Sequence, residues 1–293
     1  MSKNNNLGDF LKSLADKFRL KLDTTAKINP QDFESKIEEV GEVGYNEGWL
    51  SGAKEGIVQG KREAYDTFWD NYQSNGNRTA YEYAFAGEGW NNTTFKPKYD
   101  IVINKCRGIG TFYNSKITGS LQDILDTQGI TFTINLTDSS SKSEANMQMF
   151  GYSSFSELPV CDFSTRTGGY TLYGMFRNTQ NLEKIEKIIL PTSCNAYGSY
   201  PFYMCEKLKE IRFEGTIMHS IDFVDGIRNN CPLSADTMQD IFGHLDINEY
   251  TGTRTITVRQ VVKNNYIAKY GETEWDNNIA LFSNYGWTFA INN

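Results

Sequence analysis

Histidine and proline are scarce in this sequence, which holds 2 His and 6 Pro in 293 residues. The two histidines, His219 and His244, lie outside any metal-binding motif, and neither a Walker loop nor a Gly-x-Ser-x-Gly elbow occurs. We expect His244 to cap a helix or to lie on its polar face. The sequence therefore predicts no catalytic residue, no metal site and no cofactor, and thus a protein that is not an enzyme. The spacing of acidic residues does not exclude a pair of glycosidase carboxylates, because the two residues of such a pair come from distant parts of a chain.

Basic clusters and long apolar runs are also missing. The net charge is −7 and the pI is about 5.1, whereas binding to nucleic-acid phosphates requires a basic face. No apolar run of about 18 residues occurs, and the first residues, Met1 to Asn6, do not form a charged lead into an apolar signal core. We therefore expect no nucleic-acid partner, no membrane partner, and synthesis in the cytoplasm without export by the general secretory route.

Paired cysteines are absent as well. The five cysteines are widely spaced, with no Cys-x-x-Cys pair and no histidine at zinc-ligand spacing. They are Cys106, Cys161, Cys194, Cys205 and Cys231. The sequence predicts reduced thiols in the core, because free cysteine is among the most buried residue types.

Aromatic residues are abundant at 14% of the chain, with 17 Tyr and 18 Phe, which favours β-structure. At the N-terminus, however, apolar residues at helical spacing predict a helix from Leu7 to Phe18. Asn29 and Pro30 offer a cap and a first position for a second helix, which we expect to end near Val40.

A column of glycines follows at every fourth position: Gly44, Gly48, Gly52, Gly56 and Gly60. A four-residue step advances about 400° on a helix, so the column stays coherent only if the helix winds around a partner. Each interior glycine costs about 1 kcal/mol, which close packing would offset. We interpret the column as an oligomerisation segment. The alternatives are a helix that packs within its own chain and a flexible linker, which would not require Trp49 and Ile57.

Three segments in the second half of the chain repeat each other. Their phenylalanines, Phe150, Phe176 and Phe202, share one spacing (176 − 150 = 202 − 176 = 26). A small residue follows three positions after each, and apolar residues align further on: Ser153, Thr179 and Cys205, then Leu182 with Leu208 and Ile185 with Ile211. In the first unit the strand residues arrive one position early. A looser unit stands at Thr111 to Ser115.

Each unit predicts a turn with a buried Phe, a small residue where neighbouring units approach, and a short strand. Such units must stack, because none buries its apolar face alone. The alternative is that these segments are similar by chance in an ordinary β domain without repeats. The expected strands are Leu158 to Phe163, Ile185 to Leu190 and Leu208 to Phe213. A helical insert is expected from Ser120 to Thr127, followed by a strand from Ile130 to Leu136.

The periodicity changes after Pro232. Ser234 can cap a helix that carries Met238 and Ile241, and alternating residues predict a strand from Thr253 to Val258. A helix from Trp275 to Asn284 and a last strand from Tyr285 to Ile291 complete this part. We interpret it as a terminal cap, since the end of a stack must be covered.

The segments MFRNTQNLEKIEKIIL and FYMCEKLKEIRFEG resemble the BspA-type leucine-rich repeats of bacterial surface proteins and phage structural proteins. The opening LADKFRLKLDTTAKINPQDFESKI, the stretch EAYDTFWDNYQSNGNRTAYEYAFAGEGWNNTTFKPKYDI and the ending LSADTMQDIFGHLD with LFSNYGWTFAIN resemble tail proteins of phages that infect Gram-positive gut bacteria. The resemblance implies a structural protein of the virion, associated with the tail or baseplate and assembled in the host cytoplasm.

The predicted fold class is α+β: a helical N-terminal segment, then a short leucine-rich-repeat-like β-solenoid, then an α/β C-terminal cap. The expected domains are a helical anchor and oligomerisation segment over 1–72 and an aromatic-rich connector over 73–100. The solenoid is expected over 101–233 and the cap over 234–293.

Five tyrosines near the repeat turns are the candidate binding residues: Tyr170, Tyr173, Tyr197, Tyr200 and Tyr203. Tyrosine offers area and a polar tip, which suits receptor binding to a host cell-surface glycan or protein, although packing in the core would use these rings equally well. We expect other virion proteins as partners of the N-terminal helices, and a homo-oligomer. The alternatives are a head decoration or fibre-anchoring component that binds only virion proteins, and a bacterial surface adhesin, against which the missing export signal counts.

Overall fold

A computed structural model describes residues 12–17, 19, 84–104, 110–135, 148–166, 171–194, 196–224 and 231–293. Contacts divide the chain into two units, Met1–Asp70 and Asn71–Asn293, which are described separately. In the first unit, residues 12–17 are helical, with Leu14 and Ala15 buried, and they lie inside the first predicted helix. The second predicted helix and the glycine column lie outside the described residues.

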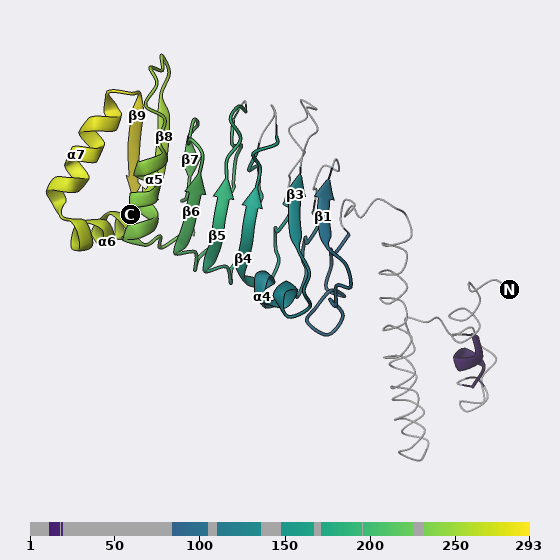
Figure 1. The fold of residues 1–293 in the computed structure, drawn as a ribbon. Helices are drawn as coiled ribbons and strands as arrows, with labels where there is room; N and C mark the ends of the chain where they lie inside the picture. Colours follow the sequence, from purple (N-terminus) through teal and green to yellow (C-terminus); the bar gives the residue numbers. More distant parts are fainter. Residues whose placement is uncertain are drawn as a thin grey trace. The chain divides into compact units, whose positions relative to one another are not determined.

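The second unit contains parallel strands with helices between them (Figure 1). The strands are β1 (Ile101–Asn104), β2 (Gly119–Ser120), β3 (Phe132–Asn135), β4 (Phe155–Asp162), β5 (Lys184–Ile189), β6 (Glu210–Glu214), β7 (Ile221–Asp222), β8 (Arg254–Arg259) and β9 (Trp287–Asn292). The helices are α4 (Leu121–Asp126), α5 (Ala235–His244), α6 (Gln260–Tyr270) and α7 (Glu272–Ser283). The strands form three sheets, in the orders β1-β3, β2-β4-β5-β6 and β7-β8-β9.

The predicted α+β class is wrong, because the described chain is mixed α/β. Every strand pair between β1 and β9 is parallel, and parallel strands need crossover connections, in which α4 to α7 lie. The described helices are therefore not concentrated at the N-terminus. No β-solenoid is found in the described residues either, since their strands belong to three separate sheets.

The strand pairing follows the alignment of the repeat units. Ile185 of β5 pairs with Ile211 of β6, as the spacing of the phenylalanines predicts. Leu158 of β4 pairs with Ile185, so the strand of the first unit is displaced by one position, also as predicted. The parallel pairing therefore places equivalent residues of successive units next to each other.

Phenylalanine rings form a continuous buried stack through the turns. The ring of Phe150 lies 5.6 Å from that of Phe112 and 5.8 Å from that of Phe176, with interplanar angles of 8° and 5°. Phe176 and Phe202 are 5.4 Å apart, and Phe202 and Phe223 are 4.9 Å apart. The looser unit around Phe112 thus belongs to the same stack, while Phe223 was not predicted to join it. All these side chains are buried, and the offset stacking of the rings adds to the burial of apolar area.

From Thr179 onward the small residue of the turn bonds to the preceding turn, whereas Ser153 bonds to the carbonyl of Phe150 in its own turn. Thr179 Oγ1 donates to the carbonyl of Phe150 over 2.8 Å, and Cys205 Sγ donates to that of Phe176 over 3.0 Å. Cys231 lies at the next equivalent position, with its Sγ 3.7 Å from the carbonyl of Phe202. Both cysteines are buried free thiols, as predicted, and burial raises the pKa of Cys205 to about 12. Cys106 lies outside the described residues.

Each turn also contains two residues in the left-handed backbone region. These pairs are Gly110 and Asn114, Gln148 and Tyr152, Gly174 and Asn178, and Tyr200 and Met204, with φ between 55° and 63°. Glycine and asparagine adopt this conformation readily, whereas tyrosine and methionine do so at a cost. The turn geometry is therefore maintained even where the sequence does not favour it.

The C-terminal region, residues 231–293, packs its helices around β8 and β9. Ser234 caps α5, as predicted, by accepting a hydrogen bond from the backbone of Thr237. The ring of Phe242 on α5 lies within 6 Å of rings from α6, α7 and β9: Tyr266, Trp275, Phe282 and Phe289. The sequence did not predict α6, whose apolar residues do not gather on one face.

Candidate functional site

The turns carry aromatic and basic side chains near their stacked phenylalanines, at positions that differ between turns. We call Tyr113, Tyr152, Arg177, Tyr200 and Tyr203 the turn face. Tyr200 is exposed at 40%, and the other four side chains are half-buried. These residues occupy four successive turns, because each stands within two residues of a stacked phenylalanine.

Arg177 lies between two tyrosine rings. Its Cζ is 5.1 Å from the ring centre of Tyr203 and 5.7 Å from that of Tyr200. The two rings are 5.8 Å apart and nearly perpendicular, at 85°. At such distances the π-faces attract the guanidinium and hold it in place. In the preceding turns, the rings of Tyr113 and Tyr152 make an edge contact at 5.2 Å.

Backbone hydrogen bonds fix the spacing of the turn face. The N–H of Tyr152 donates to the carbonyl of Arg177 over 2.8 Å, and the N–H of Asn178 donates to that of Tyr203 over 2.5 Å. Since neighbouring chains in such a ladder lie about 4.8 Å apart, four turns extend over about 15 Å. The backbone segments that carry these side chains are therefore regularly spaced.

The charge of Arg177 has no carboxylate partner among the described residues. No ion pair or hydrogen bond from its guanidinium occurs there, and its Nε is buried without a hydrogen-bond partner. Arginine on the neighbouring strands behaves differently, because Arg212 of β6 pairs with Asp240 at 3.6 Å. The turn face thus combines two partly exposed rings with a cation that lies over both of them and that has no carboxylate partner among the described residues.

The five tyrosines that the sequence suggested lie in different surroundings. Tyr200 and Tyr203 come together, and Tyr173 is half-buried against Gly198, where an added Cβ would lie 2.8 Å from the Cβ of Tyr173. Tyr197 is fully buried, and Tyr170 lies outside the described residues. Sequence reasoning missed Arg177, although it directly follows Phe176 just as Tyr203 follows Phe202.

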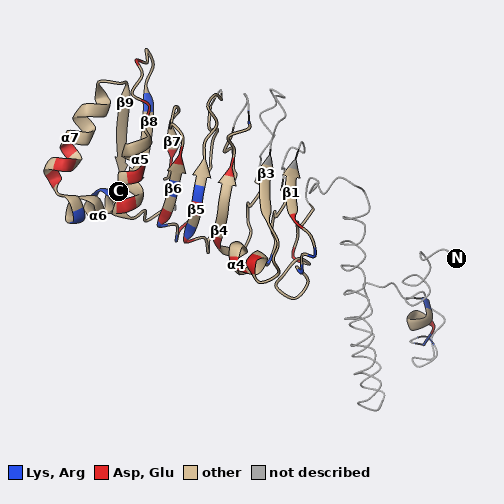
Figure 2. Cartoon of the chain, in the orientation of Figure 1, with Lys and Arg blue, Asp and Glu red and all other residues tan. Residues whose placement is uncertain are grey.

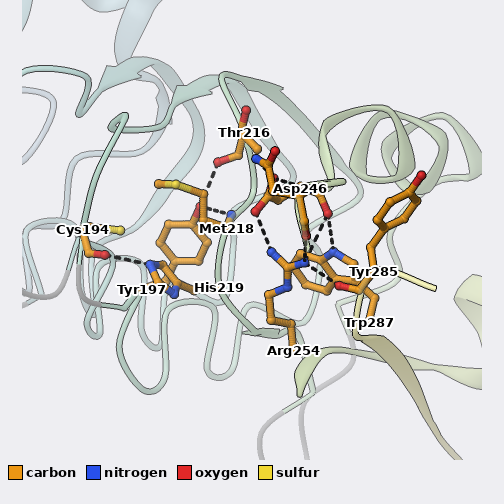
Figure 3. Close-up of polar contacts among 10 residues, drawn as sticks. Cys194, Tyr197, Thr216, Met218, His219, Asp246, Arg254, Tyr285 and Trp287 are labelled. Carbon is orange, nitrogen blue, oxygen red and sulfur yellow. Dashed lines mark hydrogen bonds and ion pairs between the residues drawn. The ribbon is translucent and has the colours of Figure 1, made fainter. Parts of the chain in front are cut away.

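Tyr197 belongs to the core (Figure 3). Its hydroxyl donates to the carbonyl of Thr216 over 3.2 Å and accepts from the N–H of Met218 over 3.0 Å. Its ring makes an edge contact with His219, whose Nε2 donates to the carbonyl of Cys194 over 2.8 Å. Burial raises the pKa of Tyr197, so the phenol stays neutral. These contacts connect the chain before β6 to the chain after it, which is a structural role.

A cavity of about 270 Å³ lies beside these residues. Its lining is Leu190, Pro191, Thr192, Gly215, Thr216, Met218, Asp246 and Asn248. Burial by itself would raise the pKa of Asp246, but hydrogen bonds from Asn248 and Arg254 outweigh it and hold that pKa below its usual value. Both carboxylate oxygens of Asp246 accept hydrogen bonds, so its charge is compensated within the protein.

Arg254 provides the positive charge in that compensation. Its Nη1 donates to Asp246 over 2.7 Å, and its Nη2 donates to the carbonyl of Tyr285 over 2.5 Å (Figure 3). The guanidinium lies between the rings of Tyr250 and Trp287, 4.6 Å from each centre. A buried ion pair of this kind positions the loop after α5 against β8 and β9.

The described residues contain no group of three or more His, Cys, Asp or Glu side chains that could hold a metal ion. His244 ends α5 and donates from Nδ1 to the carbonyl of Gly215 over 2.8 Å, so it ties the helix end to the chain after β6. In the part of the chain that the structure describes, no helix is both long and apolar enough to cross a membrane.

Comparison with known proteins gives no relative: no family model, no curated protein and no solved structure matches the chain. The partly exposed rings of the turn face, and a cation without a carboxylate partner in the part of the chain that the structure describes, are features of a binding surface.

Proposed function

We propose that this chain is a non-enzymatic structural protein of a phage virion, associated with the tail or baseplate, which binds the host surface through the turn face. The observation that supports this proposal is the cluster of Arg177, Tyr200 and Tyr203. Arginine and tyrosine are the side chains most enriched at the centres of binding surfaces. The virion context rests on the sequence resemblance.

The backbone at Tyr200 supports a role for its side chain. Tyr200 has a φ of 63°, and the equivalent positions of two other turns are Gly110 and Gly174. A side chain in this conformation costs roughly 1–2 kcal/mol, and a glycine would avoid the cost. The ring of Tyr200 is 40% exposed and therefore contributes little to the core. A role in binding explains a large side chain at this strained position better than a role in stability does.

The rigidity of the turns favours the same conclusion. Ladder hydrogen bonds and the buried Phe176 and Phe202 fix the backbone on both sides of the cluster. A ligand would therefore meet rings that are already ordered, and the conformational entropy lost on binding would be small. Sugars suit such a surface, because a tyrosine ring packs on their apolar face while its hydroxyl forms hydrogen bonds.

The test is direct binding of the fluorescently labelled full chain to a panel of Gram-positive gut bacteria. We expect the wild type to bind at least one strain, and the double variant Tyr200→Ala with Tyr203→Ala to bind at least about tenfold more weakly. Tyr270→Ala is the matched control, because Tyr270 on α6 has a similar exposed fraction of 37% and lies outside the turn face. It should bind like the wild type.

Two results would contradict the proposal. Binding to no strain at any concentration would favour a component that contacts only other virion proteins. Equal binding by the double variant and the wild type would show that another surface makes the contact. Circular dichroism of both variants verifies that they are folded.

We propose in addition that the N-terminal segment binds other virion proteins and other copies of the chain through the glycine column. Close packing against another helix requires small residues on the contacting side of the helix. The double variant Gly52→Leu with Gly56→Leu should therefore disrupt the oligomer and lower the molecular mass in solution. Light scattering on the full chain measures this, and an unchanged mass would rule out the column as the interface.

A further inference from the structure

Arg177 differs from three cations on the neighbouring strands β5 and β6. Lys184 and Lys187 on β5 pair with Glu186 and Glu214 at 3.0 and 2.8 Å, and Arg212 of β6 pairs with Asp240. Figure 2 shows these charged strands beside one another. Arg177 alone within this set has ring contacts in place of a carboxylate, as far as the described residues go.

The environment of the Arg177 guanidinium favours an anionic group of a ligand as its binding partner. Its Nε is buried without a hydrogen-bond partner, whereas its terminal nitrogens are not among the buried atoms that lack a partner. A guanidinium binds a carboxylate by two parallel hydrogen bonds, and such charge-assisted bonds are roughly twice as strong as neutral ones. The partial burial of Arg177 strengthens this attraction relative to a fully hydrated side chain.

We propose that the turn face selects an acidic saccharide, in which a sugar ring packs on Tyr200 or Tyr203 and a sugar carboxylate binds the Arg177 guanidinium. This inference rests on the proposed function and names the ligand class of the same surface. The two interactions fit together, because both rings lie within 6 Å of the cation that would hold the carboxylate. The ligand would reach along the row of turns toward Tyr152 and Tyr113.

The overall charge indicates a ligand of moderate charge density. The chain carries a net charge of −7, which repels a dense polyanion such as a nucleic acid. One arginine between uncharged rings matches a polymer with a single carboxylate on each sugar. A polypeptide of acidic residues would satisfy Arg177 but would not present an apolar sugar face to the tyrosines.

The experiment is calorimetric titration of the full chain with galacturonic acid oligomers and, in parallel, with neutral galactose oligomers of equal length. We expect the wild type to bind the acidic oligomer at least about tenfold more tightly, which corresponds to about 1.4 kcal/mol. Arg177→Gln should remove this difference and leave the weaker binding of the neutral oligomer unchanged. Arg177→Lys should restore part of the difference, because lysine keeps the charge but not the planar fork.

Arg212→Gln is the matched control, since it removes an exposed arginine of β6 outside the turn face and changes the net charge equally. It should bind like the wild type. Poly-glutamate is the control for an anion without a sugar ring, and it should bind at least about tenfold more weakly than the acidic oligomer.

The inference is overturned by any of three results: no difference between the oligomers, a preference that survives in Arg177→Gln, or equally tight binding of poly-glutamate. Those results would leave the proposed function standing if Tyr200→Ala with Tyr203→Ala still reduces cell binding. The proposed function itself would fail if the variant Tyr200→Ala with Tyr203→Ala binds cells as tightly as the wild type. The two failures are therefore distinguishable.

Discussion

The stacked turns and the C-terminal region bury their aromatic residues in different ways. In the turns, one residue type recurs at one position, so that Phe150, Phe176 and Phe202 stack with interplanar angles of 5° and 8°. In the C-terminal region, Phe242 meets tyrosine, tryptophan and phenylalanine at angles from 10° to 75°. A repeated sequence thus makes equivalent contacts, whereas a unique sequence makes a core in which each contact is different.

Polar groups show the same contrast. The turns use short neutral hydrogen bonds, such as that from Thr179 to the carbonyl of Phe150. The C-terminal region uses a buried ion pair, Arg254 with Asp246, in which the arginine side chain is only 3% exposed. A repeated neutral bond can change its donor without much loss, while a buried ion pair loses most of its value when either partner changes.

The largest effect is expected at the centre of the stack. Phe176→Ala removes a ring that contacts Phe150 on one side and Phe202 on the other, and it leaves a cavity between them. We expect the free energy of unfolding to fall by about 4 kcal/mol, which urea denaturation measures. A loss below about 1 kcal/mol would mean that the stack contributes little. Phe242→Ala provides the comparison in the C-terminal region.

The ion pair of the C-terminal region comes next. Asp246→Asn leaves the Arg254 charge buried without its counter-ion, and we expect a loss of about 3 kcal/mol at neutral pH. The pKa of Asp246 lies below its ordinary value of 3.8, so its contribution is present above that pH and is lost as the pH falls through the lowered pKa. The difference between variant and wild type should therefore shrink below about pH 4.

Urea denaturation of both proteins at several pH values checks this expectation. A difference that is the same at pH 3 and pH 7 would show that Asp246 acts through its shape and not through its charge. Variants in the turns, such as Phe176→Ala, should show no such pH dependence, because the carbonyl of Phe176 accepts from the thiol of Cys205, whose pKa is raised to about 12 and which therefore stays neutral between pH 3 and pH 7.

A smaller effect is expected in the column of small residues. Thr179→Val removes the hydroxyl that bonds to the carbonyl of Phe150, which still accepts a bond from Ser153 over 2.7 Å. We therefore expect a loss of about 1 kcal/mol in the free energy of unfolding. Cys205→Ser is the conservative control, because serine occupies the equivalent position at Ser153. Its stability should change by less than about 0.5 kcal/mol in urea denaturation.

The smallest effect concerns the left-handed positions. Gln148→Gly should raise the free energy of unfolding by about 0.5 kcal/mol, and with it the melting temperature, because glycine adopts a φ of 55° without strain. Gly174→Ala should lower the stability by about 1 kcal/mol at the equivalent position. Calorimetry that gives the same sign for both variants would contradict the equivalence of the turns.

Much of the local structure could be predicted from the sequence. The spacing of the phenylalanines predicted which residues of β5 and β6 pair, and Ser234 predicted the start of α5, because both signals depend on neighbouring residues. The predicted strand from Thr253 to Val258 and the helix from Trp275 agree with β8 and α7 within three residues.

The fold class could not be predicted, because it depends on how strands associate. Alternating residues show that a strand is half-buried, but they do not show that β7, β8 and β9 form a sheet separate from β6. The candidate site was found in part. The tyrosines were predicted from their residue type alone, and Tyr197 is in fact buried. Arg177 is a candidate because two tyrosine rings lie beside it, which the sequence does not show.

The most direct test of the central claim is competition between the free chain and virus particles for host cells. If the turn face binds the host surface, wild-type protein should reduce particle adsorption, while Tyr200→Ala with Tyr203→Ala should do so only at concentrations at least about tenfold higher. Equal competition by both proteins, or none by either, would contradict the account.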